Sequence, residues 1–338
     1  MVSVSADTVD VMPGSRPAIE ALDLVKKFGD NVAVDGVSFT VAEGTVLGLL
    51  GPNGAGKTTT VRIMATLTEP TSGTARVAGY DVRREADMVR RNVGLTGQVA
   101  TVDEMLTGRE NIRMIGGLYG IRRNELDRLG AQLLDQFAIA DAADRPVKSY
   151  SGGMRRRLDL AVSLLAGPPV LFLDEPTTGL DPRSRTDLWE VLRGLVRDGT
   201  TLLLTTQYLE EADQLADNII VMDRGRIIAE GTPLQLKRQA GNARLVVTVS
   251  SANDLPAVKA LLAKAGAEVF VDAATRQLTA AADGLPDMTR LAGWLLDSNI
   301  DVDDIGLSRP SLDDVFLSLT GHRTGEKWPA RPDQEASA

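Results

Sequence analysis

Cysteine is absent from this 338-residue chain, and histidine occurs once, at His322 near the C-terminus. The absence of cysteine excludes disulfides, thiolate metal sites and cysteine nucleophiles. With a single histidine so near the end of the chain, histidine-based metal centres and Ser-His-Asp catalysis are also excluded. Chemistry in this protein must therefore depend on other residue types.

Long hydrophobic runs are missing as well. A membrane-spanning helix needs about 20 mainly apolar residues, whereas Val46–Leu50 is far shorter and Leu158–Ala166 carries a charge. The first ten residues, Met1–Asp10, hold two aspartates and no basic region, so we expect no secretory signal. Any role in a membrane process would then be exerted from the surface, through a partner.

Net positive charge is lacking too. The formal charge is −9, which argues against nucleic acid as a partner. The length predicts two or three domains. From shifts in pattern and composition we predict four parts. They are a flexible leader (1–17), a larger domain (18–240) with a helical subdomain at about 99–165, a small accessory domain (243–321) and a disordered tail (322–338).

The larger domain shows buried strands that alternate with helical patterns. The strands are expected at Val46–Leu50, Val170–Leu173 and Thr201–Thr205, and a helix with one apolar face at Arg185–Arg197. A hairpin is predicted across Asp223–Gly225. This alternation indicates an α/β fold.

The accessory domain has its own order of elements. Strands are expected at Arg244–Ser250, Glu268–Asp272, Arg276–Ala281 and Asp301–Gly306. Helices are expected between them at Asn253–Ala265 and Pro286–Ser298, and a terminal helix at Ser311–Thr320. The βαββαβ order is typical of a ferredoxin-like α+β layer.

A glycine-rich segment directly follows the first buried strand. It matches G-x-x-x-x-G-K-[ST], in which glycines let backbone N–H groups wrap phosphates and the next helix offers its N-terminus to the anion. Lys57 is expected to reach the β- and γ-phosphates, and the Thr58 hydroxyl to hold Mg²⁺. The predicted ATP-binding residues here are Gly51, Pro52, Asn53, Gly54, Ala55, Gly56, Lys57, Thr58 and Thr59.

Two carboxylates end the second buried strand. Asp174 is placed to bind Mg²⁺ directly or through water, and Glu175 to polarise a water molecule against the γ-phosphate. Adjacent acids after a strand can also merely begin a helix. A phosphate loop upstream favours the catalytic interpretation.

These motifs and four others occur in the order found in the ATP-binding subunits of ABC transporters. The chain resembles that family over about residues 18–240. Tyr150-Ser-Gly-Gly-Met154 resembles the family signature, and Thr178-Gly-Leu-Asp181 its D-loop. Gln98 matches the Q-loop glutamine, and Phe28 the aromatic residue that stacks on adenine. The resemblance implies a P-loop NTPase fold that binds ATP and Mg²⁺.

The family architecture implies a head-to-tail homodimer with ATP between the subunits. Ser151, Gly152 and Gly153 would face the γ-phosphate held by the partner, and Asp181 would communicate across the dimer. Gln98 would contact Mg²⁺ or water and couple to a membrane permease through the helical segment 99–150.

Three positions depart from the family pattern. Tyr150 and Met154 replace leucine and glutamine at the edges of the signature, while the residues expected to contact phosphate are kept. Gln207 stands where the family has a switch histidine. Its amide can donate to the γ-phosphate but cannot carry a proton, so Gln207 is predicted to assist hydrolysis only through a neutral hydrogen bond.

Two helical patterns lie outside the motifs. Arg155–Arg157 is interpreted as a solvated helix face. Near the C-terminus, apolar residues at i, i+3, i+4 and i+7 form a face that we expect to pack on its own domain or on a neighbouring chain. They are Leu312, Val315, Phe316 and Leu319.

A narrower resemblance extends to about residue 321. The segments 150–158, 206–217 and 309–317 resemble the daunorubicin/doxorubicin resistance ATP-binding proteins. This implies an ATPase subunit at the cytoplasmic membrane face that drives drug or antibiotic efflux through a separate permease.

Two alternatives stay open. One is a soluble ABC ATPase in DNA repair or translation. Against it, only 94 residues separate Lys57 from Ser151, without the sustained heptads of a coiled coil, and the chain holds a single cassette. The other is an exporter of lipid or polysaccharide, which the sequence does not separate from a drug exporter.

Overall fold

The computed structural model describes residues 17–97, 101–239, 243–264, 269–308 and 311–320. Residues 1–16 of the predicted leader, Gln98 and the predicted tail with His322 lie outside the described residues, while Pro17, the last residue of the predicted leader, begins the first strand. The described chain divides into two compact units, one ending at Thr232 and the other beginning at Pro233. Among the described residues, no helix is long and apolar enough to cross a bilayer.

The centre of the first unit is a six-stranded sheet in the order β10-β9-β3-β8-β7-β6. All neighbours are parallel except β9 and β10. Every residue of β3, β7 and β8 is buried, as expected for parallel strands covered on both faces. The strands are β3 (Val46–Leu50), β6 (Val93–Thr96), β7 (Val170–Asp174), β8 (Thr201–Thr206), β9 (Asn218–Asp223) and β10 (Arg226–Gly231).

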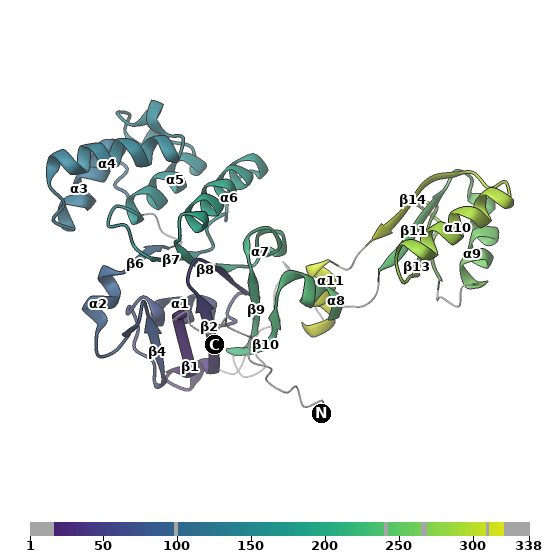
Figure 1. Cartoon of the computed structure of the whole chain (residues 1–338), viewed down its shortest axis with the longest axis horizontal. Helices are drawn as coiled ribbons and strands as arrows, with labels where there is room; N and C mark the ends of the chain where they lie inside the picture. The colour runs from purple at the N-terminus through teal and green to yellow at the C-terminus, as the bar shows by residue number, and fades with distance from the viewer. Residues whose placement is uncertain (1–16, 98–100, 240–242, 265–268, 309–310, 321–338) are drawn as a thin grey trace, which may run out of the picture. The chain divides into compact units, whose positions relative to one another are not determined.

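A second, antiparallel sheet has the order β2-β1-β4-β5 (Figure 1). Its strands are β1 (Pro17–Phe28), β2 (Asn31–Ala42), β4 (Ser72–Val77) and β5 (Tyr80–Asp81). One hydrophobic cluster joins this sheet to helix α1 (Lys57–Met64) and to the six-stranded sheet. Buried Val61, Ile63 and Met64 thereby fix the helix that follows the phosphate loop.

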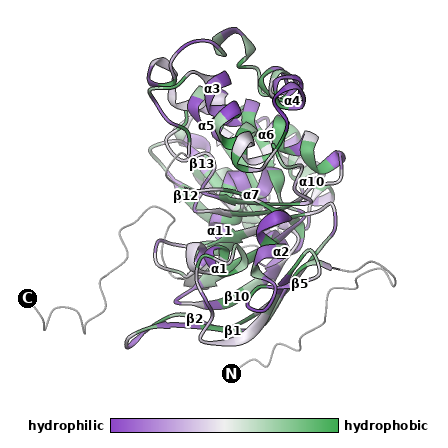
Figure 2. Ribbon diagram, turned by 90° about the vertical axis from the view of Figure 1, so that its left-hand side faces the viewer, coloured by the Kyte–Doolittle hydropathy of each residue, from purple (hydrophilic) through white to green (hydrophobic). Residues whose placement is uncertain are grey.

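Three helices gather at one end of the unit (Figure 1). They are α3 (Gly108–Leu118), α4 (Arg123–Gln136) and α5 (Gly152–Ser163). Figure 2 shows hydrophilic and hydrophobic residues on different sides of α4, whose Leu126, Leu133 and Leu134 are buried. The remaining helices of the unit are α2 (Ala86–Arg91), α6 (Pro182–Arg197) and α7 (Leu209–Leu215), with 3-10 turns at Ala140–Ala142 and Val147–Ser149.

Helix α6 begins three residues earlier than the apolar pattern predicts. Asp181 caps it by accepting a hydrogen bond from the Ser184 N–H, and Pro182 occupies its first position. A proline is well suited to this position, because the first N–H of a helix has no partner in it. The cap and the proline, rather than the hydrophobic face, set the start of the helix.

The second unit contains a four-stranded antiparallel sheet in the order β12-β13-β11-β14. Numbered within the unit, this is 2-3-1-4, the ferredoxin-like arrangement that the sequence predicts. Helices α9 and α10 contribute to its core. The elements are α8 (Pro233–Gln239), β11 (Arg244–Val249), a 3-10 turn (Ala252–Asp254), α9 (Leu255–Lys264), β12 (Val269–Asp272), β13 (Gln277–Ala281), α10 (Leu285–Asp297), β14 (Val302–Ser308) and α11 (Leu312–Thr320).

The apolar face of α11 is buried at Leu312, Val315 and Phe316, while the side chain of Leu319 lies outside the described residues. Helix α11 contacts α8, where Leu236 is also buried. The face therefore packs within the protein.

Candidate active site

Residues 51–56 form a tight loop between β3 and α1. Gly51, Gly54 and Gly56 have φ angles of 157°, 81° and 104°. A Cβ on Gly51 would lie 2.3 Å from the Met222 carbonyl oxygen, and one on Gly56 would lie 2.5 Å from that of Ala33. Conformation and close packing thus both require glycine at these two positions.

Lys57, the first residue of α1, is buried beneath this loop. Its Nζ donates to the carbonyl oxygens of Gly51, at 2.6 Å, and Pro52, at 3.0 Å. Burial lowers the pKa of Lys57, while the charges of Glu175 and Asp174 act in the opposite direction. The ammonium is therefore held against the loop that the sequence assigns to phosphate binding.

The predicted metal ligands Thr58 and Asp174 are in contact. Thr58 Oγ1 donates to Asp174 Oδ1 at 3.1 Å, and Thr205 Oγ1 donates to the same oxygen at 2.5 Å. Hydroxyl and carboxylate oxygens are donors that Mg²⁺ prefers, and Mg²⁺ in nucleotide sites usually takes only one or two protein ligands. No group of three or more acidic or histidine side chains able to hold a metal occurs in the part of the chain that the structure describes. The two oxygens fit a Mg²⁺ ion completed by phosphate and water.

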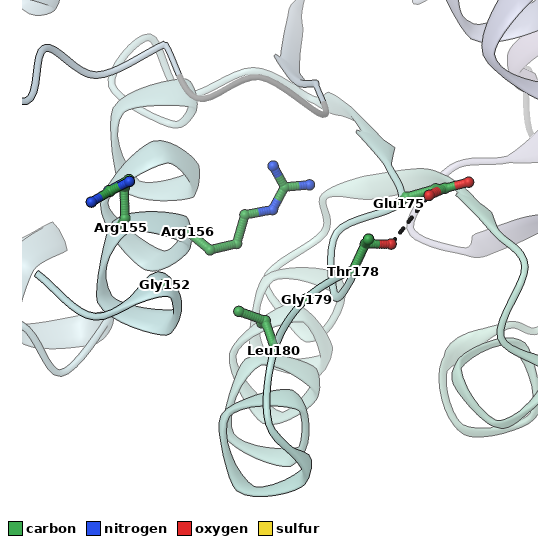
Figure 3. Close-up of a pocket in the computed structure, with 7 residues that line it drawn as sticks. All are labelled: Gly152, Arg155, Arg156, Glu175, Thr178, Gly179 and Leu180. Carbon is green, nitrogen blue, oxygen red and sulfur yellow. Dashed lines mark hydrogen bonds between the residues drawn. The ribbon is translucent and has the colours of Figure 1, made fainter.

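Glu175 follows Asp174 in a left-handed backbone conformation, with φ near 50°. This conformation costs a non-glycine residue roughly 1–2 kcal/mol. Its N–H donates to the Thr205 carbonyl oxygen at 3.0 Å, and its Oε2 accepts a hydrogen bond from Thr178 Oγ1 at 3.1 Å (Figure 3). The backbone of Glu175 is thus held by strand β8, and its carboxylate by Thr178 three residues further along the chain.

Gln207 lies between the end of β8 and the start of α7. Strand β8 pairs with β3 on one side and β7 on the other, with Thr206 opposite Leu50 and Thr205 opposite Asp174. The phosphate loop, Glu175 and Gln207 therefore follow the carboxyl ends of three adjacent parallel strands, the edge where such sheets bind ligands.

The predicted signature and D-loop residues lie at two helix N-termini. Ser151 caps α5, with its Oγ accepting from the Met154 N–H at 3.2 Å. Asp181 accepts from the hydroxyl of Ser184 at 2.6 Å, and hydrogen bonds from Ser184 lower the pKa of Asp181. A Cβ on Gly153 would lie 2.9 Å from Ser184 Oγ, so the two caps are adjacent.

Ser151 and Gly152 are exposed, as are Asn53 and Gly54 of the phosphate loop. Phe28 ends β1 with 52% of its surface exposed, and the Lys26 ammonium lies 4.8 Å from the centre of its ring. A cavity of about 250 Å³ is lined by Gly152, Arg155, Arg156, Glu175, Thr178, Gly179 and Leu180 (Figure 3).

The interpretation of Arg155–Arg157 as a solvated face is wrong. Arg155 pairs with Glu104 at 2.8 Å, and Arg157 with Asp187 at 2.7 Å. The side chain of Arg156 is only 11% exposed and donates hydrogen bonds to three backbone carbonyls. The available signal was an aspartate three residues after Arg156, within an otherwise apolar stretch.

Tyr150, one of the two signature departures, is also buried. Its hydroxyl donates to the Ala142 carbonyl oxygen at 2.7 Å, and burial raises its pKa. A Cβ on Gly108 would lie 2.6 Å from the same hydroxyl. Tyr150 therefore packs inside the helical region, and the phenol ties the start of α5 to the neighbouring turn.

Comparison with known proteins places this geometry in a family. A family model described as ABC transporter matches residues 34–178. The chain is 53% identical to the daunorubicin resistance ATP-binding protein DrrA2 of Streptomyces coeruleorubidus, over 91% of this chain and 96% of that protein. The chain belongs to the ATP-binding subunits of ABC transporters. As an ABC cassette it binds nucleotide and is an ATPase.

Other relatives agree. The doxorubicin resistance ATP-binding protein DrrA of Mycobacterium tuberculosis is 47% identical to this chain, over 86% of this chain and 89% of its own length. A solved ATP-binding subunit of an ABC transporter superposes with a TM-score of 0.60 at 29% identity, over 66% of this chain and 92% of that structure. A nucleotide-free ATP-binding cassette superposes with a TM-score of 0.59 at 25% identity, over 64% and 92%.

Proposed function

We propose that this ATPase drives export of a drug or antibiotic through a separate permease, from the cytoplasmic face of the membrane. The main support is sequence identity. About half of the residues are identical to those of daunorubicin resistance ATP-binding proteins over nearly the full chain, the second unit included. A shared cassette alone would not extend past the first unit.

In this proposal the phosphate loop and Lys57 bind the phosphates of ATP, and Phe28 stacks on adenine. Thr58, Asp174 and Gln98 hold Mg²⁺, which when bound neutralises charge on the β- and γ-phosphates. Glu175 accepts a proton from the attacking water. The support is the contact between Thr58 and Asp174 and the common strand edge from which Lys57 and Glu175 emerge.

A homodimer would complete the site. Ser151, Gly152 and Gly153 would contact the γ-phosphate bound to the partner subunit, and Asp181 would signal across the interface. Support comes from the exposure of Ser151 and Gly152 at the N-terminus of α5, where backbone N–H groups favour an anion.

A membrane partner is supported by the surface of the helical region. Large apolar side chains are exposed there, two of them, Met114 and Leu118, one turn apart on α3, and exposed apolar patches are typical of interaction sites. They are Met105, Met114, Leu118 and Tyr119.

The direct test is to co-purify the chain from membranes, identify its partner, and express both in a drug-sensitive host. Cells with both proteins should accumulate less daunorubicin than cells with the permease and the Lys57→Ala cassette. Equal accumulation would count against drug as the cargo.

Export of another cargo is the second candidate, because a Nod factor export ATP-binding protein of Ralstonia nicotianae is 40% identical over 91% of this chain.

Replacing Gln207 by alanine should slow ATP turnover by roughly three- to tenfold. The reason is that one neutral hydrogen bond to the γ-phosphate contributes about 0.5–1.5 kcal/mol. Phosphate release with the permease present measures the rate, and Gln214→Ala, an exposed glutamine on α7, is the matched control. An alanine variant as fast as wild type would show that Gln207 does not act as the switch residue.

Ending the chain at Thr232 should leave the affinity for ATP within about twofold of wild type and weaken export or subunit assembly. The predicted nucleotide-binding residues all precede this point, and the cut falls at the boundary between the two units. ATP titration and the drug-accumulation assay measure the two effects. Loss of nucleotide binding in the shortened chain would mean that the second unit supports the ATP site.

A further inference from the structure

Helix α5 carries an inward-facing ion pair that has no role in the proposed mechanism of ATP hydrolysis. Arg156 and Asp159 lie one turn apart, with Nη1 and Oδ2 3.6 Å from each other. Asp159 is 1% exposed, and the Arg156 side chain is 11% exposed. Isolated charges are costly to bury, so both groups need partners.

The partners of Arg156 are backbone carbonyls from two distant loops. Its Nε donates to Pro176 at 2.9 Å and its Nη2 to Asp174 at 3.3 Å. Its Nη1 donates to Gly97 at 2.6 Å. Pro176 and Asp174 are the two sequence neighbours of Glu175, so the planar guanidinium holds the carbonyl groups of the residues before and after it. Figure 3 shows the side chain extending from α5 toward the loop.

Asp159 in turn restrains the arginine. Its Oδ1 accepts from the Thr101 N–H at 2.7 Å. Burial raises the pKa of Asp159, and the Thr101 N–H and Arg156 both counter this rise. A second acid, the fully buried Glu211 of α7, also acts on Arg156 electrostatically. The arginine is thus confined by opposite charge to a position where its fork meets the carbonyls.

The need for such a clamp follows from the backbone of Glu175. A left-handed conformation at a non-glycine residue persists only where the surroundings enforce it. The residue's own N–H bonds to β8, and the carbonyls of the residues before and after it accept from Arg156. Without the clamp, the carboxylate could turn away as the backbone relaxes.

We propose that Arg156, held by Asp159, is a positioning residue that fixes Glu175 in the orientation needed for hydrolysis. Because Ser151 caps α5, the same side chain connects the helix that follows the signature residues to the segment around Glu175. The hydrogen bonds described for Arg156 reach no residue of the phosphate loop. The clamp is therefore expected to affect turnover and not nucleotide affinity. This inference rests on the proposed catalytic role of Glu175.

The test is Arg156→Lys in the full chain, assayed with its permease. Lysine keeps the positive charge beside Asp159 but cannot span three carbonyls with a point-like ammonium. We expect kcat for ATP to fall about tenfold, equivalent to about 1.4 kcal/mol, with KM within twofold. The matched control is Arg157→Lys, the same change on the next residue of α5, which pairs with the Asp187 carboxylate and should keep kcat within twofold.

Thermal unfolding of each variant separates positioning from structural support. The inference is overturned if Arg156→Lys retains wild-type kcat, or if its kcat, ATP affinity and unfolding temperature all fall together. It is also overturned if Arg157→Lys loses as much turnover as Arg156→Lys. A Glu175→Gln variant is measured alongside. If that variant hydrolyses ATP at the wild-type rate, the proposed role of Glu175 fails first, whatever Arg156→Lys does.

Discussion

Replacing Lys57 by alanine should weaken ATP binding by roughly 10- to 150-fold and reduce hydrolysis below detection. A hydrogen bond to a charged group contributes about 1.5–3 kcal/mol, which converts to that range of affinity. The substitution also removes the Lys57 hydrogen bonds from the carbonyl oxygens of Gly51 and Pro52, of which Pro52 keeps the one from the Ala55 N–H. Titration with a fluorescent ATP analogue and a phosphate-release assay measure the two effects.

Arg62→Ala is the control for this prediction. Arg62 lies in the last turn of the same helix α1 and is exposed, so its loss tests whether any removal of positive charge nearby has the same effect. The control should bind ATP with wild-type affinity. An unchanged affinity and turnover in Lys57→Ala would refute the assignment of residues 51–58 to phosphate binding.

Replacing Glu175 by glutamine should lower kcat by roughly 10²- to 10⁴-fold while ATP affinity stays within twofold. General base catalysis has about this magnitude, and an amide does not accept the proton of the attacking water. The hydrogen bond from Thr178 can be kept, because the glutamine Oε1 also accepts. Single-turnover hydrolysis and equilibrium ATP binding separate the two quantities, and exposed Glu190 on α6 provides a matched Glu→Gln control.

The same variant tests the proposed dimer. With hydrolysis stopped, ATP should remain between the subunits, and light scattering should show a doubling of mass at saturating Mg-ATP. A Glu175→Gln protein that stays monomeric with ATP, even beside its permease, would contradict the sandwich arrangement.

The elements that hold the site were predictable because their signals are local. Val46–Leu50 and Val170–Leu173 are short apolar runs whose residues are all buried in the structure. The first is followed directly by the phosphate loop, and the second by Asp174 and Glu175. Parallel pairing then brings their carboxyl ends together without further information. The accessory unit was predictable for a similar reason, since its strands and helices alternate with clear turns.

The arginine clamp was not predictable in this way. Arg155, Arg156 and Arg157 are identical in type and adjacent, and the one local signal, Asp159 three residues after Arg156, indicates an ion pair but not the carbonyl partners. The partners of Arg156 lie 18, 20 and 59 residues away, at Asp174, Pro176 and Gly97. Only the tertiary fold brings them together. The left-handed conformation of Glu175 is equally invisible in sequence, because glutamate gives no signal for it.

If this cassette hydrolyses ATP to drive a permease, the reconstituted pair should show both the hydrolysis and its coupling to cargo. The cassette and its co-purified permease are reconstituted in liposomes, and phosphate release is followed with Mg-ATP, with and without daunorubicin. We expect hydrolysis that the drug stimulates, and its loss in the Glu175→Gln complex. Hydrolysis that is indifferent to the drug and undiminished by Glu175→Gln would contradict it.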